Sequence, residues 1–109
     1  MRIELIAFVA GAALACVIAP SVAQNTAIPV TIDNFVFEPE RLTVRAGTTV
    51  TWINRDDIPH TVVATDGSFK SPVLDTDERF TRQFGAPGAY PYYCSVHPRM
   101  TGKILVRAG

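Results

Sequence analysis

Four side chains that bind soft or borderline metals stand in a pattern that predicts a metal site. Cys94, His97 and Met100 are three residues apart near the C-terminus, and Pro98 stiffens the segment between the last two. The fourth, His60, lies far upstream. A site that uses all four residues must therefore join a distant strand end to one loop, which requires a folded scaffold.

The composition strengthens this hypothesis. The chain contains two His, two Cys and two Met, and Met1 and Cys16 lie in an N-terminal segment with the character of a leader. All the remaining residues of these three types belong to the set of four. Each has an ordinary alternative role, since Cys and Met are usually buried packing residues and His is often a loop residue. The coincidence of all four favours metal binding.

The types of ligand favour copper over zinc. Structural zinc sites use four Cys or His ligands and gain nothing from a thioether. Two imidazoles and a thiolate in a trigonal plane, with a weak axial Met, are the ligand set of a blue copper site. We therefore expect one copper ion that cycles between Cu(I) and Cu(II), with His60, Cys94, His97 and Met100 as its ligands.

Other functions explain the four residues less well. A protein for copper storage or delivery remains the alternative, although the chain has no additional cluster of Met or His. A copper enzyme with a second metal ion would need further His ligands. A thiol hydrolase built on Cys94 and His97 would leave His60 and Met100 without a role. We expect no enzymatic activity.

Residues 1–23 are predicted to be a secretory signal peptide. Arg2 precedes an apolar run from Leu5 to Ala19, and Ser21-Val22-Ala23 forms a small-x-small cleavage site before Gln24. The run is shorter than the roughly 20 residues of a membrane span, although an uncleaved anchor and a lipoprotein at Cys16 are alternatives. Export predicts a periplasmic protein with no stable membrane insertion once the leader is removed.

Residues 24–109 are expected to form one domain. Removal of the leader leaves 109 − 23 = 86 residues, enough for a single core. Their charge is balanced, so the basic excess of a nucleic-acid-binding protein is absent, and we expect a monomer. Only one Cys remains, which excludes an internal disulfide, and metal ligation would protect this thiol in an oxidising compartment.

The elements that must position the site are short strands. Alternating or β-branched residues bounded by turn residues predict strands, and helical periodicity is absent. A loop or edge segment is expected over 69–77. In the strand predicted over 78–84, Arg82 shares a face with Phe80 and Phe84, which predicts a bulge or an edge position. The predicted strands cover residues 28–33, 42–45, 48–54, 60–65, 78–84, 90–94 and 101–107.

Several motifs resemble the cupredoxin family, in particular its amicyanin and plastocyanin group. They are Pro59-His60-Thr61-Val62, the turn Pro87-Gly88 before Tyr90-Pro91-Tyr92-Tyr93-Cys94, and the loop from Cys94 to Met100 followed by Thr101-Gly102-Lys103-Ile104. Phe35 to Pro39 and Ala46 to Asn54 extend the resemblance over nearly all of the mature chain. The resemblance implies an all-β, Greek-key antiparallel β-sandwich of seven or eight strands with one copper ion at one end.

The resemblance also implies the role of each ligand and the mode of action. His60, Cys94 and His97 would be the equatorial ligands and Met100 the axial one. The protein would be a soluble one-electron carrier that transfers electrons through the exposed His97. Redox proteins would serve as donor and acceptor and dock transiently near His97, Val96, Pro98 and Pro59.

Two positions depart from the family pattern. Thr61 stands where many relatives have Asn, and its hydroxyl is expected to fasten the two ligand loops by a hydrogen bond. Arg99 stands where amicyanin has an aromatic residue. This charge changes the surface that a partner would meet.

Overall fold

Alternating side chains determine the strands of this fold. In the segment Thr48–Asn54, the side chains of Val50, Trp52 and Asn54 are buried, whereas the residues between them are partly exposed, because successive side chains of a strand face opposite sides. A computed structural model describes residues 26–109, and the predicted leader lies outside this range. The strands are β1 (Ile28–Asp33), β2 (Val36–Glu38), β3 (Arg41–Arg45), β4 (Thr48–Asn54), β5 (Val63–Ala64), β6 (Arg79–Phe84), β7 (Gly88–Tyr93) and β8 (Thr101–Arg107).

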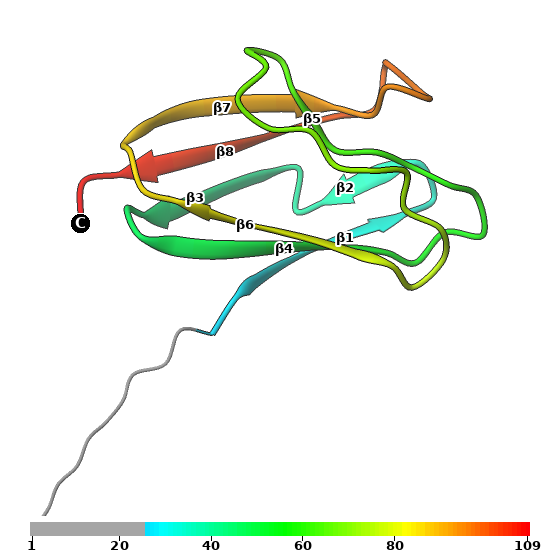
Figure 1. Ribbon diagram of the computed structural model, residues 1–109, viewed down its shortest axis with the longest axis horizontal. Coiled ribbons are helices and arrows are strands. Elements are labelled where there is room, and N and C mark those ends of the chain that lie inside the picture. The colour runs from blue at the N-terminus through cyan, green and yellow to red at the C-terminus, as the bar shows by residue number, and fades with distance from the viewer. Residues whose placement is uncertain (1–25) are drawn as a thin grey trace, which may run out of the picture.

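The eight strands form two sheets that pack face to face (Figure 1). One sheet has the order β2-β1-β4-β6 and the other β3-β8-β7-β5. No helix occurs within residues 26–109, and the predicted all-β sandwich is confirmed. The resemblance implied antiparallel sheets, but the sheets are mixed, because β1 pairs with β4 and β3 pairs with β8 in parallel. The parallel pairs arise because the chain crosses to the other sheet at β3 and returns at β4, and parallel neighbours require such a crossover.

Most of the predicted strands are confirmed, three of them with the same bounds, at residues 28–33, 48–54 and 101–107. The strand predicted over 60–65 is much shorter, since β5 contains only Val63 and Ala64. The segment before it is held by an isolated bridge between His60 and Leu74. The Val62 N–H donates to the Ser71 side chain at 2.8 Å, not to a neighbouring strand. The irregular segment 69–77 replaces a regular partner strand there.

Strand β6 lies at the edge of its sheet, as one of the two interpretations of Arg82 predicted. Its register with β4 is continuous from Phe84 to Arg79, without a bulge. The Arg82 guanidinium lies 5.0 Å from the centroid of the Phe69 ring and 5.6 Å from that of Phe84. A cation–π contact of this kind explains why a charged residue occupies the same face as two aromatic residues.

The hairpin between β1 and β2 was not predicted. Asn34 and Phe35 form its two-residue loop, with φ angles of 53° and 62°. Two consecutive positive φ angles fit the twist of a tight hairpin, and Asn tolerates this region, whereas Phe rarely adopts it. The loop places Phe35 at one end of the sandwich.

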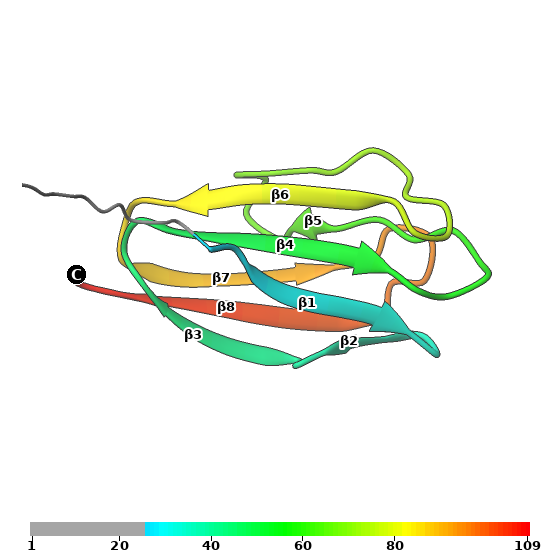
Figure 2. The ribbon, with the colours of Figure 1, turned by 90° about the horizontal axis from the view of Figure 1, so that it is seen from below.

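The connections at this end carry the predicted ligands. The ends of β1 and β4, the start of β6 and the loop between β7 and β8 meet at the end of the sandwich opposite the C-terminus (Figure 2). Behind them lies an aromatic core formed by Phe37, Trp52, Phe84 and Tyr92. Within the described part of the chain, no helix is long and apolar enough to cross a membrane.

Close packing of Gly102 against Tyr92 gives a test of this core. Gly102 pairs with Tyr92 across β8 and β7, and a Cβ atom at position 102 would overlap the buried Tyr92 ring. We expect Gly102→Ala to lower the free energy of unfolding by about 1–3 kcal/mol through overpacking, as measured by urea denaturation. Gly85→Ala is the control, because a Cβ atom there meets no neighbour. Equal effects of the two substitutions would contradict the packing.

Candidate metal centre

The loop between β7 and β8 is closed by its own backbone. Strand β7 ends at Tyr93, and the Cys94 N–H then donates to the Met100 carbonyl at 3.0 Å. Within the loop, the His97 N–H donates to the Cys94 carbonyl at 3.2 Å, and the Met100 N–H donates to the His97 carbonyl at 2.9 Å. These bonds repeat at the three-residue spacing of the predicted ligands. They turn the loop so that Cys94 and His97 face the same point.

His60 reaches this point from the other side of the sandwich end. Its N–H donates to the Leu74 carbonyl at 3.1 Å, and its carbonyl accepts from the Leu74 N–H at 2.8 Å. Pro59 precedes it, so the chain enters this bridge with a restricted backbone. The side chain of His60 is completely buried.

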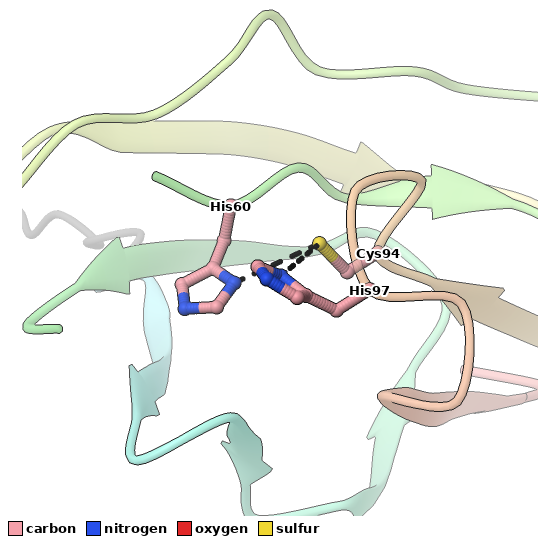
Figure 3. Close-up of side chains that lie close together, drawn as sticks. All are labelled: His60, Cys94 and His97. Atoms are coloured by element: carbon pink, nitrogen blue, oxygen red, sulfur yellow. Dashed lines mark hydrogen bonds between the residues drawn. The ribbon is translucent and has the colours of Figure 1, made fainter. Parts of the chain in front are cut away.

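Three of the predicted ligands come together (Figure 3). The Cys94 sulfur lies 3.7 Å from His60 Nδ1 and 3.9 Å from His97 Nδ1, and the three atoms lie within 4.8 Å of one another. Ligand atoms bound at about 2.0–2.3 Å to one ion stand roughly 3–4 Å apart, so this spacing suits a single metal ion. Cys94 and His60 are buried, whereas His97 is partly exposed.

Met100 lies at the end of the same loop. It is only 5% exposed and belongs to the hydrophobic core. It also borders a shallow hollow together with His97. The structure therefore places Met100 in a buried position of the loop that carries Cys94 and His97.

Thr61 fastens the two ligand segments together, as predicted. Its N–H donates to the Cys94 sulfur at 3.4 Å. Its hydroxyl oxygen accepts a hydrogen bond from the Ser95 N–H at 2.8 Å. The segment that carries His60 is thus tied directly to the loop that carries Cys94.

The surroundings of Cys94 favour the thiolate. Burial alone would raise the pKa of the thiol, but the hydrogen bond from the Thr61 N–H and the contacts of the sulfur with the His60 and His97 rings outweigh it and lower the pKa to about 6. A metal-bound Cys must be deprotonated. The side chain is therefore suited to metal ligation.

Two residues of this site were not identified from the sequence. The Asp56 carboxylate lies 2.9 Å from His60 Nε2, and the Phe35 ring packs edge-on against the His60 and His97 rings, with centroid distances of 5.5 and 5.0 Å. The only sequence signal for Asp56 is its place four residues before His60. Asp57 is adjacent and exposed, so the pattern did not distinguish them, and Phe35 is too distant in sequence to be assigned.

The surface beside His97 is largely apolar. A hollow of about 630 Å³ is lined by Phe35, Val96, His97, Pro98, Arg99 and Met100. Val96 and Pro98 were expected there, whereas Pro59 is exposed but does not line the hollow. Phe35, which is 43% exposed, is an additional apolar member. Arg99 is the charged residue of its rim.

The donor atoms fit copper. Two imidazole nitrogens and a sulfur that readily becomes a thiolate converge, and the cluster contains no carboxylate oxygen. Hard ions such as Mg²⁺ and Ca²⁺ prefer oxygen ligands, whereas a His₂Cys set with a nearby Met is characteristic of copper.

Removal of the Thr61 hydroxyl should weaken the link between the ligand segments. We expect Thr61→Val, which keeps the shape of the side chain, to lower the free energy of unfolding of the metal-free protein by about 1–2 kcal/mol, because the Ser95 N–H loses its acceptor. Thr81→Val is the control, since the Thr81 hydroxyl meets Thr51 on an exposed face. Urea denaturation of both variants measures the difference, and an equal loss at both positions would contradict the role of Thr61.

Comparison with known proteins shows the family to which the chain belongs. Residues 5–106 match the cupredoxin-like domain family. Amicyanin of Paracoccus denitrificans is 38% identical over 85 residues, which cover 73% of this chain and 65% of that protein. Amicyanin-alpha of Methylorubrum extorquens is 35% identical over 109 residues, which cover 94% of this chain and 92% of that protein. The chain thus spans slightly less than two thirds of the first relative and most of the second.

A solved structure shows the same architecture. A reduced amicyanin mutant superposes with a TM-score of 0.72 at 35% identity, covering 79% of this chain and 86% of that one. Cupredoxins bind one copper ion, and the residues assembled here fit that cofactor. From the matching family, the related sequences and the shared fold, we conclude that this chain belongs to the cupredoxin-like family.

Proposed function

We propose that the mature protein is a periplasmic one-electron carrier whose copper ion is held by His60, Cys94, His97 and Met100. The observation that carries the proposal is the assembly of one sulfur and two imidazole nitrogens within 4.8 Å of one another. His60, Cys94 and His97 would provide the trigonal plane and Met100 the weak axial ligand. When bound, copper supplies a reversible Cu(II)/Cu(I) couple in such a set.

The protein contributes a rigid site. The Thr61 N–H and the closed loop hold the Cys94 sulfur in place. Residues buried between two sheets move little, because protein interiors are closely packed. A rigid site whose ligands lie between the coordination preferences of Cu(II) and Cu(I) would gain or lose an electron with little rearrangement.

His97 is the proposed route for the electron. Of the three assembled ligands it is the only one that is not fully buried, and it borders the apolar hollow. Donor and acceptor proteins would dock transiently near His97, Val96, Pro98 and Pro59, with Phe35 as a further contact. Redox encounters typically bury less than about 1,200 Å² in total, so a small surface suffices, and a monomer can serve both partners in turn.

Localisation in the periplasm follows from the predicted leader. Residues 1–23 have the three regions of a signal peptide. The thiol of Cys94, the only one within residues 26–109, would be protected from oxidation there, because it is buried and would bind copper.

A visible absorption spectrum tests the proposed function directly. We expect the protein without its leader to become intensely blue on addition of Cu(II), because a trigonal His₂Cys site gives a strong thiolate-to-copper absorption. The band should bleach with ascorbate and return on reoxidation, and Cys94→Ser should lack it. A colourless protein that still binds copper would contradict an electron carrier and favour copper storage or delivery.

Electron self-exchange between the Cu(I) and Cu(II) forms tests the route through His97. We expect Val96→Asp to slow self-exchange at least about tenfold, because two molecules that dock through this surface would bring like charges together. Val73→Asp is the matched control, since Val73 is similarly exposed, at 57% against 50% for Val96, but lies outside the hollow. NMR line broadening in mixtures of the Cu(I) and Cu(II) proteins measures the self-exchange rate. An equal effect of both variants would contradict electron transfer at this surface.

A further inference from the structure

We propose that Asp56 is the positioning residue of this centre, because its carboxylate holds His60 in the tautomer that presents Nδ1 to the metal. The inference rests on the proposed ligand set. It assigns a specific role to a residue that would not itself touch copper.

The geometry leaves one assignment for the protons of His60. Its Nε2 lies 2.9 Å from Asp56 Oδ2, and the side chains are 0% and 10% exposed. An ionised carboxylate only accepts hydrogen bonds, so Nε2 must carry the proton. In the neutral ring, Nδ1 then keeps its lone pair, and this atom is the one that lies 3.7 Å from the Cys94 sulfur.

The Asp56 side chain acts as an acceptor in both of its hydrogen bonds. Its Oδ2 atom lies 2.9 Å from His60 Nε2 and accepts from the Phe35 N–H at 3.1 Å.

The backbone of Asp56 is fixed by its neighbours. Its N–H donates to Asn54 Oδ1 at 2.9 Å, and its carbonyl accepts from the Thr76 hydroxyl at 2.6 Å. Asn54 is completely buried and donates to the carbonyls of Ile58 and Leu74, both at 2.9 Å. Leu74 is also the bridge partner of His60. The buried Asn54 side-chain amide thus holds both the backbone of Asp56 and Leu74, the bridge partner of His60.

The same carboxylate oxygen holds the hairpin loop of β1 and β2. Asp56 Oδ2 accepts the Phe35 N–H at 3.1 Å, which helps to stabilise Phe35 at its unfavourable φ of 62°. The Phe35 ring in turn packs against both imidazoles. Asp56 therefore positions His60 directly and His97 only through an aromatic contact.

His97 has no equivalent support. Within residues 26–109, no carboxylate or carbonyl accepts a hydrogen bond from its Nε2. Carboxylates that bind the far nitrogen of a metal-bound His fix its tautomer and increase its basicity. We therefore expect His60 to be the stronger and more rigid of the two imidazole ligands.

A matched set of variants separates the effect of the hydrogen bond between Asp56 and His60 from the effect of the Asp56 charge. Asp56→Ala removes the acceptor and the charge, Asp56→Asn keeps an acceptor oxygen and removes the charge, and Asp57→Asn removes a neighbouring exposed charge. The measurements are the His60 tautomer of the metal-free protein by ¹H–¹⁵N NMR, the Cu(II) affinity by competition with a chelator, and the reduction potential of the copper-loaded protein.

We expect Asp56→Ala to lose the uniform Nε2–H tautomer of His60 and to bind Cu(II) about 10- to 100-fold more weakly, as is typical when such a partner of a metal ligand is removed. Its reduction potential should rise, because the more highly charged Cu(II) state loses a nearby negative charge. Asp56→Asn should keep the tautomer but show part of the rise. Asp57→Asn should match the wild type.

Two results would overturn the proposal. One is an unchanged tautomer and Cu(II) affinity in Asp56→Ala, and the other is an equal change of potential in Asp56→Asn and Asp57→Asn. If Asp56→Ala does not fold, the comparison of the two Asn variants decides alone. A wild-type protein that does not turn blue with Cu(II) would refute the proposed function, whereas a blue wild type with an unaltered Asp56→Ala variant would refute only the role of Asp56.

Discussion

A sulfur atom buried between two imidazole rings is the constraint on which this structure depends. Cys94 is 0% exposed, and a buried thiolate is costly unless hydrogen bonds or opposite charges stabilise it. The Thr61 N–H provides one such bond at 3.4 Å. The His60 and His97 rings beside the sulfur add to this stabilisation, and a bound cation would complete it. The arrangement therefore supplies the protein ligands of a metal site.

The two-sheet architecture explains how this sulfur and its partners are brought together. Cys94 follows β7 of one sheet, whereas His60 lies in the connection that leaves β4 of the other. The Thr61 hydroxyl and the bridge to Leu74 join these elements at the end of the sandwich. Neither sheet could form the site alone, so the packing of the core also determines the spacing of the ligands.

Sequence analysis identified the site residues that are recognisable by residue type. It did not identify those whose positions depend on how loops and turns fold. His60, Cys94 and His97 were identified because few other residues of the chain have soft or imidazole donors. The segment around His60 was expected to be a regular strand, but the irregular segment that pairs with it offers side chains and single bridges in place of a ladder. The roles of Asp56 and Phe35 depend on how two turns meet in space, and no local pattern records this.

His60 and His97 differ in the hydrogen bonds and burial that hold their rings, and this difference fits different roles for the two side chains. His60 is buried, bridged through its backbone and bonded at its far nitrogen to Asp56. His97 is partly exposed, stands on a short loop and borders the apolar hollow. If a redox partner docks at His97, as proposed, this side chain cannot also be enclosed by buried hydrogen-bonding groups, because those groups would occupy the docking surface. Rigidity at His60 therefore allows His97 to remain accessible without loss of the geometry around the sulfur.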